Sequence, residues 1–372
     1  MRTSLSRFAL MLVCCAEFSP LPGCGSTDRR DDPIPDDGGR GSGRDAALAG
    51  PPDAAGPGLA PDAGPTRDAG SSAAGTDAAR PGDAAVVPTA GDAGMSDKLV
   101  PAQGALLGHF YGDGTSAETD ARIGRKPSVH LSYFAWSDDW TKNEAPAQDL
   151  ADGRIPLVNW EPAGVNFADI VSGKEDALIE ARAVGAKALK APFFLDFAAE
   201  MNGDEGTDWT GNDAALYIAA YRHIHDLFVA KGATNVVWVW APNVTDVDGS
   251  NKHTLDYYPG DPYVDWTGVD GYNWGTSDKS FSWLSFHDVF KDIYPILATK
   301  GKPILIGEMA SDEVGGDKGK WIDGIVPTLK SDFPLIRAFV WFDIKKERAW
   351  QINSSPGSLA AYKRLALDPF MK

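Results

Sequence analysis

Eight apolar, strand-like runs recur at intervals of about 33 residues, and no other feature of the sequence restricts the fold as strongly. Amphipathic segments separate them, which is the pattern of a parallel sheet covered by helices. The predicted strands are Ala105–Tyr111, Ser128–Ala135, Ile155–Trp160, Phe193–Ala198, Asn235–Trp240, Trp266–Tyr272, Pro303–Gly307 and Arg337–Phe342. Because eight βα units close into one barrel of about 250 residues, we expect an α/β fold, a single (β/α)8 TIM barrel.

The segments between these runs read as helices. Asp213 is suited to cap a helix whose apolar residues recur at helical spacing and which ends at Gly232. Further apolar stripes predict helices over 321–329 and 286–293. A doubly wound open sheet would show the same periodicity, but no glycine-rich phosphate loop follows the first strand. The barrel is therefore favoured.

The first 24 residues have the pattern of a lipoprotein-type signal peptide. Arg2 and Arg7 precede an apolar run over 8–16, and Leu21–Cys24 resembles a lipobox. Cleavage there would leave Cys24 lipidated at the new N-terminus. An ordinary signal peptide with an incidental cysteine is the alternative.

Residues 25–98 consist largely of Asp, Ala, Gly and Pro. Such a segment has little apolar surface to bury, so we expect a disordered linker ahead of a folded domain at 99–372. A linker behind a lipidated cysteine would act as a tether. We therefore expect a secreted or cell-surface protein, an outer-membrane lipoprotein held to the membrane only by its lipid.

Charge and composition restrict the partners. A net charge of −17 disfavours nucleic acid and anionic membrane, whereas a neutral polymer is compatible with it. The 12 tryptophans suit a polysaccharide, because sugar rings present flat C–H faces to aromatic side chains, although Trp-rich cores also exist. All 3 cysteines lie in the leader, so the folded part has no thiol for a disulfide, a zinc site or a nucleophile. We expect no bound metal and no cofactor. The chain is expected to be a monomer.

Active sites of such barrels lie where the strands end at the carboxyl face. Aromatic and carboxylate residues dominate the ends of the predicted strands. We expect contacts with a sugar from His109, Tyr111, Trp160, Glu161, Asn202, Trp209, Trp240, Tyr272, Trp274 and Trp341.

Two glutamates, Glu200 and Glu308, close the fourth and seventh predicted strands. Strands three apart lie nearly across the barrel mouth from each other, so the two side chains can face one bond from opposite sides. Glycosidic hydrolysis requires such a pair, a protonated carboxyl for the leaving oxygen and an ionised carboxylate for the anomeric carbon. The alternative for either residue alone is an ordinary ion pair.

The folded part resembles glycoside hydrolase family 26, which is best known for endo-β-mannanases. The matching segments are Asp213–Asn243, Asn159–Pro162, Ala199–Gly203, Tyr258–Tyr272, Ile306–Met309 and Lys318–Trp321. The resemblance implies a retaining barrel enzyme with Glu200 as acid/base and Glu308 as nucleophile. It also implies that Tyr272 bonds the nucleophile and that Trp341 is the platform under the sugar being cleaved.

The acid/base motif departs from the family pattern, which has Arg four residues before the glutamate and His directly before it. This chain has Asp196 and Ala199 there. Asp196 is either a buried partner for a neighbouring strand or a group with a changed catalytic use. A further acidic segment, Thr245–Asn251, departs from the calcium-loop pattern, so a solvated loop is expected there.

The function expected from the sequence is hydrolysis of a β-linked polysaccharide, with β-1,4-mannan as the first substrate. Mixed-linkage β-glucan and β-1,3-xylan are alternatives within the same family pattern. The rival from another class is a non-catalytic surface glycan-binding protein on a disabled barrel.

Overall fold

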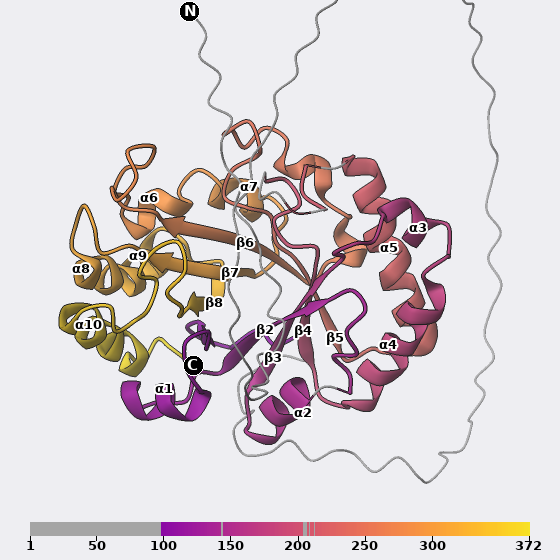
Figure 1. Cartoon of the computed structure of the whole chain (residues 1–372), viewed down its shortest axis with the longest axis horizontal. Helices are drawn as coiled ribbons and strands as arrows, with labels where there is room; N and C mark the ends of the chain where they lie inside the picture. Colours follow the sequence, from indigo (N-terminus) through magenta and orange to yellow (C-terminus); the bar gives the residue numbers. More distant parts are fainter. Residues whose placement is uncertain (1–97, 143, 204–206, 208, 212) are drawn as a thin grey trace, which may run out of the picture. The chain divides into compact units, whose positions relative to one another are not determined.

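The computed structural model describes residues 98–372 except 143, 204–206, 208 and 212. Eight parallel strands, hydrogen-bonded in sequence order, form a closed barrel with helices between them, which confirms the predicted (β/α)8 fold (Figure 1). The strands are β1 (Leu106–Phe110), β2 (Val129–Ala135), β3 (Ile155–Glu161), β4 (Phe193–Phe197), β5 (Val236–Trp240), β6 (Trp266–Asn273), β7 (Ile304–Ser311) and β8 (Ile336–Phe342).

Ten α-helices and two short 3-10 helices are assigned within the described residues. They are α1 (Ser116–Ile123), α2 (Glu144–Ala151), α3 (Phe167–Val171), α4 (Asp176–Ala188), α5 (Ala214–Lys231), η1 (Thr254–Tyr257), η2 (Asp261–Tyr263), α6 (Phe286–Phe290), α7 (Tyr294–Ala298), α8 (Lys318–Asp323), α9 (Ile325–Ser331) and α10 (Pro356–Leu367). Across the described ranges, no helix is long and apolar enough to cross a membrane. The predicted signal peptide, its Cys24 and the linker lie outside the described residues.

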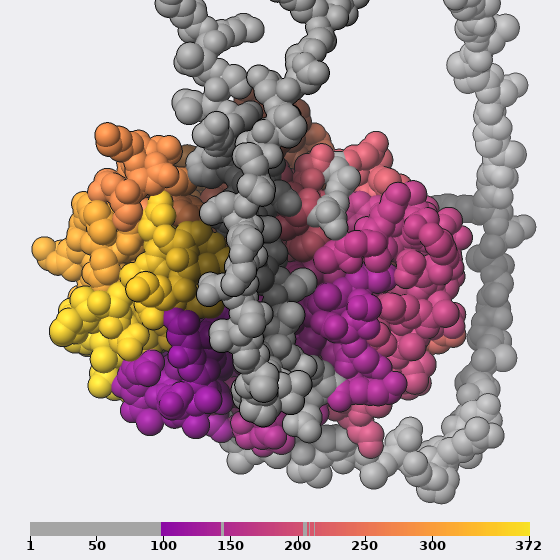
Figure 2. Space-filling view, in the orientation of Figure 1, coloured from indigo at the N-terminus to yellow at the C-terminus, as the bar shows by residue number. Residues whose placement is uncertain are grey.

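The barrel closes because β1 pairs with both β2 and β8. The C-terminal helix α10 then packs beside α1, so the two ends of the folded domain meet; Figure 2 shows their surfaces next to each other in yellow and indigo. The last residue strengthens this closure, since the Lys372 backbone N–H donates to the carbonyl oxygen of Ala105 at 2.8 Å.

The predicted strand boundaries agree with the structure to within about one residue, except at β7. That strand continues to Ser311, four residues beyond the predicted end at Gly307. The pairing register shifts between Val269 and Asp270 on the β6 side, and again between Ile306 and Met309 on the β8 side. Such irregularities are characteristic of barrel rims near active sites, and this one places Glu308 inside the strand.

The helices follow the predicted caps but are often shorter than expected. The Asp213 carboxylate accepts from the Ala215 backbone N–H at 2.8 Å, and Gly232 ends α5 with φ of 73°. The stripe over 321–329 falls on two short helices, with Gly324 separating α8 from α9, and the stripe over 286–293 forms a helix, α6, only as far as Phe290.

Apolar side chains, at least one from every strand, fill the barrel interior near the amino-terminal ends of the strands. These buried residues are Leu106, Val129, Leu157, Phe194, Val237, Trp266, Leu305 and Ala338. Burying each large one stabilises the fold by about 1.5–3 kcal/mol. Successive side chains on a strand alternate between the inside and the outside of the barrel. Every second residue after each of these core residues therefore also faces the interior, closer to the carboxyl end. Those residues carry the polar groups of the candidate site.

Candidate active site

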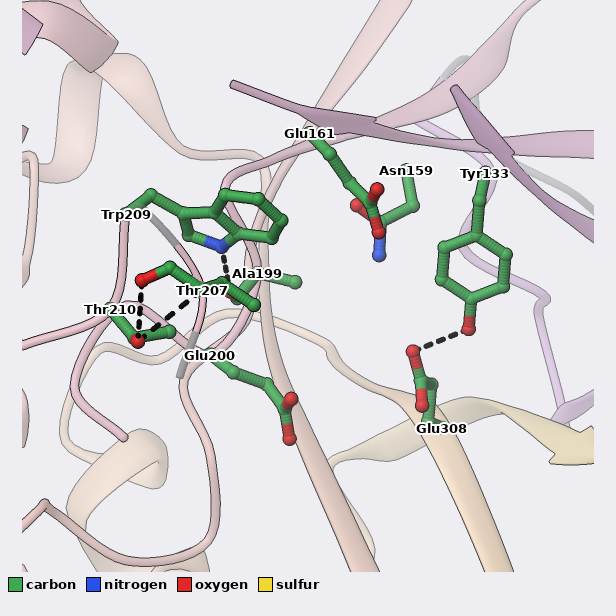
Figure 3. Close-up of a pocket in the computed structure, with 9 residues that line it drawn as sticks. All are labelled: Tyr133, Asn159, Glu161, Ala199, Glu200, Thr207, Trp209, Thr210 and Glu308. Atoms are coloured by element: carbon green, nitrogen blue, oxygen red, sulfur yellow. Dashed lines mark hydrogen bonds between the residues drawn. The ribbon is translucent and has the colours of Figure 1, made fainter. Parts of the chain in front are cut away.

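A pocket with about 260 Å³ of free space lies at the carboxyl end of the barrel. Its lining comes from β2, β3, β7 and the segment that follows β4 (Figure 3). The lining residues are Tyr133, Asn159, Glu161, Ala199, Glu200, Thr207, Trp209, Thr210 and Glu308. The pocket thus brings three carboxyl side chains into one small space.

Glu308 is held from two sides by tyrosines. The Tyr133 hydroxyl donates to Oε1, and the Tyr272 hydroxyl donates to Oε2. Both rings are fixed by edge-to-face packing, Tyr133 on Phe110 at 5.2 Å and Tyr272 on Phe342 at 5.9 Å between ring centroids. Since the rings cannot easily turn away, the two phenols orient the carboxylate.

Opposing influences act on the Glu308 carboxyl. Burial raises its pKa above the ordinary value, whereas the Tyr133 and Tyr272 hydrogen bonds and the positive charge of Lys346 lower it. The net direction is upward. The two phenols and the lysine therefore stabilise the ionised form against the cost of burial.

Glu200 has a different environment. Like Glu308 it is half-buried, but it lies three residues beyond the end of β4 and has a left-handed backbone with φ of 59°. Its backbone N–H donates to the Ala241 carbonyl at 2.8 Å, and its Oε1 accepts from the Asn243 carboxamide nitrogen at 2.6 Å. Asn202 in turn accepts from the Asn243 backbone N–H at 2.8 Å. This chain of contacts holds Glu200 at the pocket edge.

Backbone strain accompanies this position. Ala198 also has a left-handed conformation, with φ of 54°. Residues other than glycine adopt that region at a cost of about 1–2 kcal/mol each. The strained turn aims the Glu200 side chain toward the pocket that Glu308 enters from β7 (Figure 3).

A third pocket carboxyl, Glu161, comes from the end of β3. Burial and then the nearby Glu308 carboxylate raise its pKa to about 7, while Lys346 lowers it. Glu161 therefore titrates near neutral pH and can be a hydrogen-bond donor below that value.

Two more acids lie buried in the barrel under the pocket. Asp196 on β4 and Asp270 on β6 are 3% and 1% exposed. Burial and the charge of Glu308 raise both pKa values well above the ordinary range. Each has one carboxyl oxygen, Oδ1, without a hydrogen-bond partner among the described residues. Neutral, protonated carboxyls are the state that such surroundings favour.

Comparisons with known proteins agree with this geometry. Residues 176–346 match the model of glycosyl hydrolase family 26. Over 248 residues, 64% of this chain and 27% of the relative, the sequence is 43% identical to Endoglucanase H of Acetivibrio thermocellus. Over 233 residues, 58% of this chain and 57% of the relative, it is 25% identical to a mannan endo-1,4-beta-mannosidase of Bacillus subtilis.

Over residues 176–346, the chain is therefore similar to glycoside hydrolase family 26.

Solved structures resemble the barrel. A family 26 beta-mannanase from Bacteroides ovatus has a TM-score of 0.57 at 17% identity, covering 73% of this chain and 90% of that one. A mannanase of Bacillus subtilis has a TM-score of 0.54 at 19% identity, covering 72% and 86%. At these identities the likeness supports the fold alone. The chain spans 27% and 57% of the two relatives' lengths, so the activities in their names do not transfer directly.

In this barrel, several predicted site residues meet at one place. Glu200, Glu308, Glu161 and Trp209 line the pocket, and Tyr272 reaches it through Glu308. The Trp209 indole N–H donates to the Ala199 carbonyl at 2.9 Å, and only 6% of the residue is exposed. Their roles toward a sugar stay predictions, but their positions permit such contacts.

Five predicted sugar contacts lie elsewhere, and the structure corrects them. These buried residues are His109, Tyr111, Trp160, Trp240 and Trp341. Strand parity is the reason, because the inner positions belong to neighbours such as Val239 and Val340. The five side chains therefore point outward, toward the helices, and offer a sugar little or no surface.

Their contacts show structural roles. His109 lies between Tyr362 and Asp343, with ring nitrogens 3.0 and 2.9 Å from their oxygens. Trp341 is fully buried, and its indole N–H donates to the Trp350 carbonyl at 2.9 Å. The platform role implied by the family resemblance is therefore not supported for Trp341.

Two further predicted contacts support the site from its margin. Asn202 is 1% exposed and positions Asn243, as described above. Trp274 is half-buried and packs against Phe281 at 5.1 Å and Trp350 at 5.2 Å between ring centroids. Neither residue lines the pocket itself.

The sequence reasoning missed Tyr133 and Asn159 as site residues. Tyr133 and Asn159 are partners in the β2–β3 register and face the interior. Inward-facing positions recur at every second residue of a strand, so counting in steps of two from the inward apolar residues would have identified both.

Within the described residues, no group of three or more His, Cys, Asp or Glu side chains is arranged to hold a metal ion. In the acidic segment Thr245–Asn251, the Asp246 carboxylate accepts from Asn202 at 3.0 Å, from the His253 backbone N–H at 2.8 Å and from Thr254 at 2.8 Å. Asp246 therefore has a structural role, since these hydrogen bonds hold the loop in its conformation.

Proposed function

We propose that this protein is a retaining glycoside hydrolase of a β-linked polysaccharide, with Glu308 as nucleophile and Glu200 as acid/base. The observation that carries the proposal is the contrast between the two residues in one pocket. Both side chains are half-buried, but a phenol donates to each oxygen of Glu308, whereas Glu200 sits at the pocket edge and accepts from the Asn243 amide. A fixed carboxylate suits nucleophilic attack, and a carboxyl near solvent suits repeated proton exchange.

The reaction follows in two steps. A Glu308 oxygen attacks the anomeric carbon while Glu200 donates its proton to the leaving glycosidic oxygen, so that the C–O bond breaks and a glycosyl ester forms. Glu200, now ionised, takes a proton from water, which attacks the same carbon and releases Glu308. Two inversions at one carbon give net retention.

Two polysaccharide backbones are candidates. Mixed-linkage β-glucan is favoured by the 43% identity to a protein named Endoglucanase H and by Ala199, which replaces the histidine of the mannanase-like pattern. β-1,4-Mannan, the first choice from the sequence, is supported by the mannan endo-1,4-beta-mannosidase relatives at 25–30% identity. We expect the higher kcat/KM on β-glucan.

Reducing-sugar release from purified β-glucan, mannan and β-1,3-xylan tests both the activity and the substrate order. Binding without release from any of the three would favour the non-catalytic alternative. Release from mannan alone would reverse the substrate order while leaving the mechanism in place.

The roles of the two glutamates are tested by Glu308→Ala. This variant should lose turnover, and azide should restore part of it on an activated aryl glycoside, giving a glycosyl azide of inverted configuration. A small anion can then attack from the face that the carboxylate occupied. Normal hydrolysis by the variant would contradict the assignment.

We further propose that the protein is a surface lipoprotein anchored through Cys24. The support is the lipobox-like Leu21–Cys24 sequence ahead of an Asp/Ala/Gly/Pro-rich segment. Cell fractionation of the full chain and of Cys24→Ala tests this proposal, since the variant should leave the membrane fraction. A wild-type chain that is wholly soluble outside the cell would contradict it.

A further inference from the structure

One polar side chain in the pocket has no explained partner. Asn159 on β3 is 5% exposed, and its carboxamide oxygen is buried without a hydrogen bond to any described residue. A buried amide oxygen left unpaired costs about 1–3 kcal/mol. Its place in the pocket therefore calls for a partner or a use.

Several other polar side chains of the pocket are already engaged. Tyr133 donates to Glu308, and Glu200 accepts from Asn243. The Thr207 and Thr210 hydroxyls are 3.3 Å apart and bond each other. Ala199, where the family pattern has histidine, supplies no polar group. Asn159 is thus a polar group of the pocket wall that the proposed mechanism does not yet use.

The strand register places beside Asn159 a residue that could donate a hydrogen bond to its unpaired oxygen. Asp196 is its partner on β4, faces the same interior, and also has an unpaired buried oxygen. Burial and the Glu308 charge raise the Asp196 pKa, so the carboxyl keeps its proton. One O–H of a neutral Asp196 donated to the Asn159 oxygen would satisfy both groups.

That bond would leave the Asn159 amide nitrogen for the pocket. Figure 3 shows the nitrogen on the side of the pocket that carries Glu200 and Glu308. On its other side, Asn159 pairs in register with Tyr133, which touches Glu308. The carboxamide is therefore one strand away from a residue that contacts the nucleophile.

A sugar attacked by Glu308 presents its 2-hydroxyl next to the anomeric carbon, and hydrogen bonds to that hydroxyl strengthen in the transition state. We propose that Asn159 is a specificity-determining residue that donates its amide N–H to the 2-hydroxyl of the sugar being cleaved, with Asp196 as the positioning residue that orients the amide. The inference rests on the proposed function. It also gives Asp196 a use where the family pattern has arginine.

The test is a double-mutant cycle between the residue and the hydroxyl. Aryl β-disaccharide glycosides are compared with and without the 2-hydroxyl on the ring that is cleaved. Asn159→Ala should lower kcat/KM about tenfold to a hundredfold on the parent glycoside, and less than about threefold on the 2-deoxy glycoside. Asn159→Leu, which keeps most of the side-chain volume, provides a second variant if the alanine variant does not fold.

The Asp196 role is tested by paired variants. Asp196→Leu should show the same substrate-dependent loss, because it cannot donate to the amide oxygen. Asp196→Asn can donate, so it should restore kcat/KM to within about threefold of wild type. A control is Asn235→Ala, which removes a half-buried amide outside the pocket that donates to the Ala186 and Ala191 carbonyls at 2.8 and 3.0 Å. It should lower thermal stability and leave the ratio between the two glycosides unchanged.

Equal losses on both glycosides would overturn the inference, because the effects would then be additive and Asn159 would not contact the 2-hydroxyl. Failure of Asp196→Asn to restore activity would overturn the positioning role. A wild-type protein that cleaves neither glycoside nor any polysaccharide would contradict the proposed function itself, which separates that failure from the other two.

Discussion

The two glutamates that we propose as catalytic occupy different kinds of structure. Glu308 lies within the strand β7, with each carboxylate oxygen bonded by a tyrosine. Glu200 follows β4 in a strained turn, with φ of 59° and an amide as its side-chain partner. The same residue type is thus prepared for two tasks. In the proposed mechanism, the strand fixes a charged group in place, and the turn carries a proton donor to the edge where the leaving sugar and water would arrive.

Among variants that distinguish the role of Glu200 from that of Glu308, the largest effect is expected from Glu200→Ala. Without the acid/base, kcat/KM on a polysaccharide should fall by about 10²–10⁴-fold. An aryl glycoside with a very acidic phenol needs no proton, so its bond-breaking step should be little affected. Steady-state and burst kinetics on both substrate types check this. Equal losses of the bond-breaking rate on both would contradict the acid role.

The nucleophile side is probed by Tyr272→Phe and Tyr133→Phe. Each change removes a donor to the ionised carboxylate, and such a bond contributes about 1.5–3 kcal/mol. Because the donors lower the pKa of Glu308, their loss should raise it, and the acid limb of kcat/KM should move to higher pH.

The pH–rate profiles of the two tyrosine variants give the measurement. Other charged or titratable groups act on the same pocket: Glu161, Asp196, Glu200, Asp270, Lys346 and Glu347. Glu347→Gln serves as a control of opposite sign, since its charge raises the Glu308 pKa and its removal should move the limb down. If the acid limb of kcat/KM stays at the same pH in both tyrosine variants, the ionisation of Glu308 does not determine that limb.

The strain on the acid/base side is tested by two neighbouring alanines. Ala198 has φ of 54°, whereas Ala199 is not among the residues with positive φ. Both are buried, so glycine removes a buried methyl in each case. Ala198→Gly should cost less stability than Ala199→Gly by about 1 kcal/mol, because it relieves the left-handed conformation. Denaturant unfolding measures the difference, and equal costs would argue against strain at Ala198.

The smallest effect on activity is expected from Asp196→Asn. A neutral amide replaces a carboxyl whose pKa is raised by burial and by Glu308, so the acid limb should stay in place. Stability should behave differently. The folded state binds the proton more tightly than the unfolded chain, so this group's contribution is lost as pH rises through the folded pKa.

Asp196→Asn removes that dependence, and its melting temperature at neutral pH should equal or exceed that of the wild type. Thermal unfolding across pH provides the measurement. An acid limb that moves to lower pH in this variant would mean that Asp196 is charged and opposes ionisation of Glu308.

The barrel was predictable because its strands are apolar runs that end in turn-forming residues. The boundaries of β2 and β5 were predicted to within one residue. The end of β7 was not, because an irregular register lets the strand continue past Gly307. No local pattern in the sequence marks such a shift.

The site was predicted only in part, for a physical reason. Residues were chosen because they end strands, and strand ends do not determine on which face a side chain lies. Glu161 lines the pocket, whereas its neighbour Trp160 points outward and stacks on Trp136 at 4.4 Å between ring centroids. The bond between Tyr133 and Glu308 joins β2 to β7, and it depends on barrel closure.

The most direct test of the central claim is to trap the glycosyl-enzyme. An aryl 2-deoxy-2-fluoro-β-glycoside of the preferred sugar slows both steps, because fluorine destabilises the positively charged transition state, and a good leaving group lets the ester accumulate. Mass spectrometry of the digested protein should place the sugar on Glu308, within the segment Pro303–Met309. A label on Glu161 or Glu200, or turnover with an inverted product and no adduct, would contradict the account.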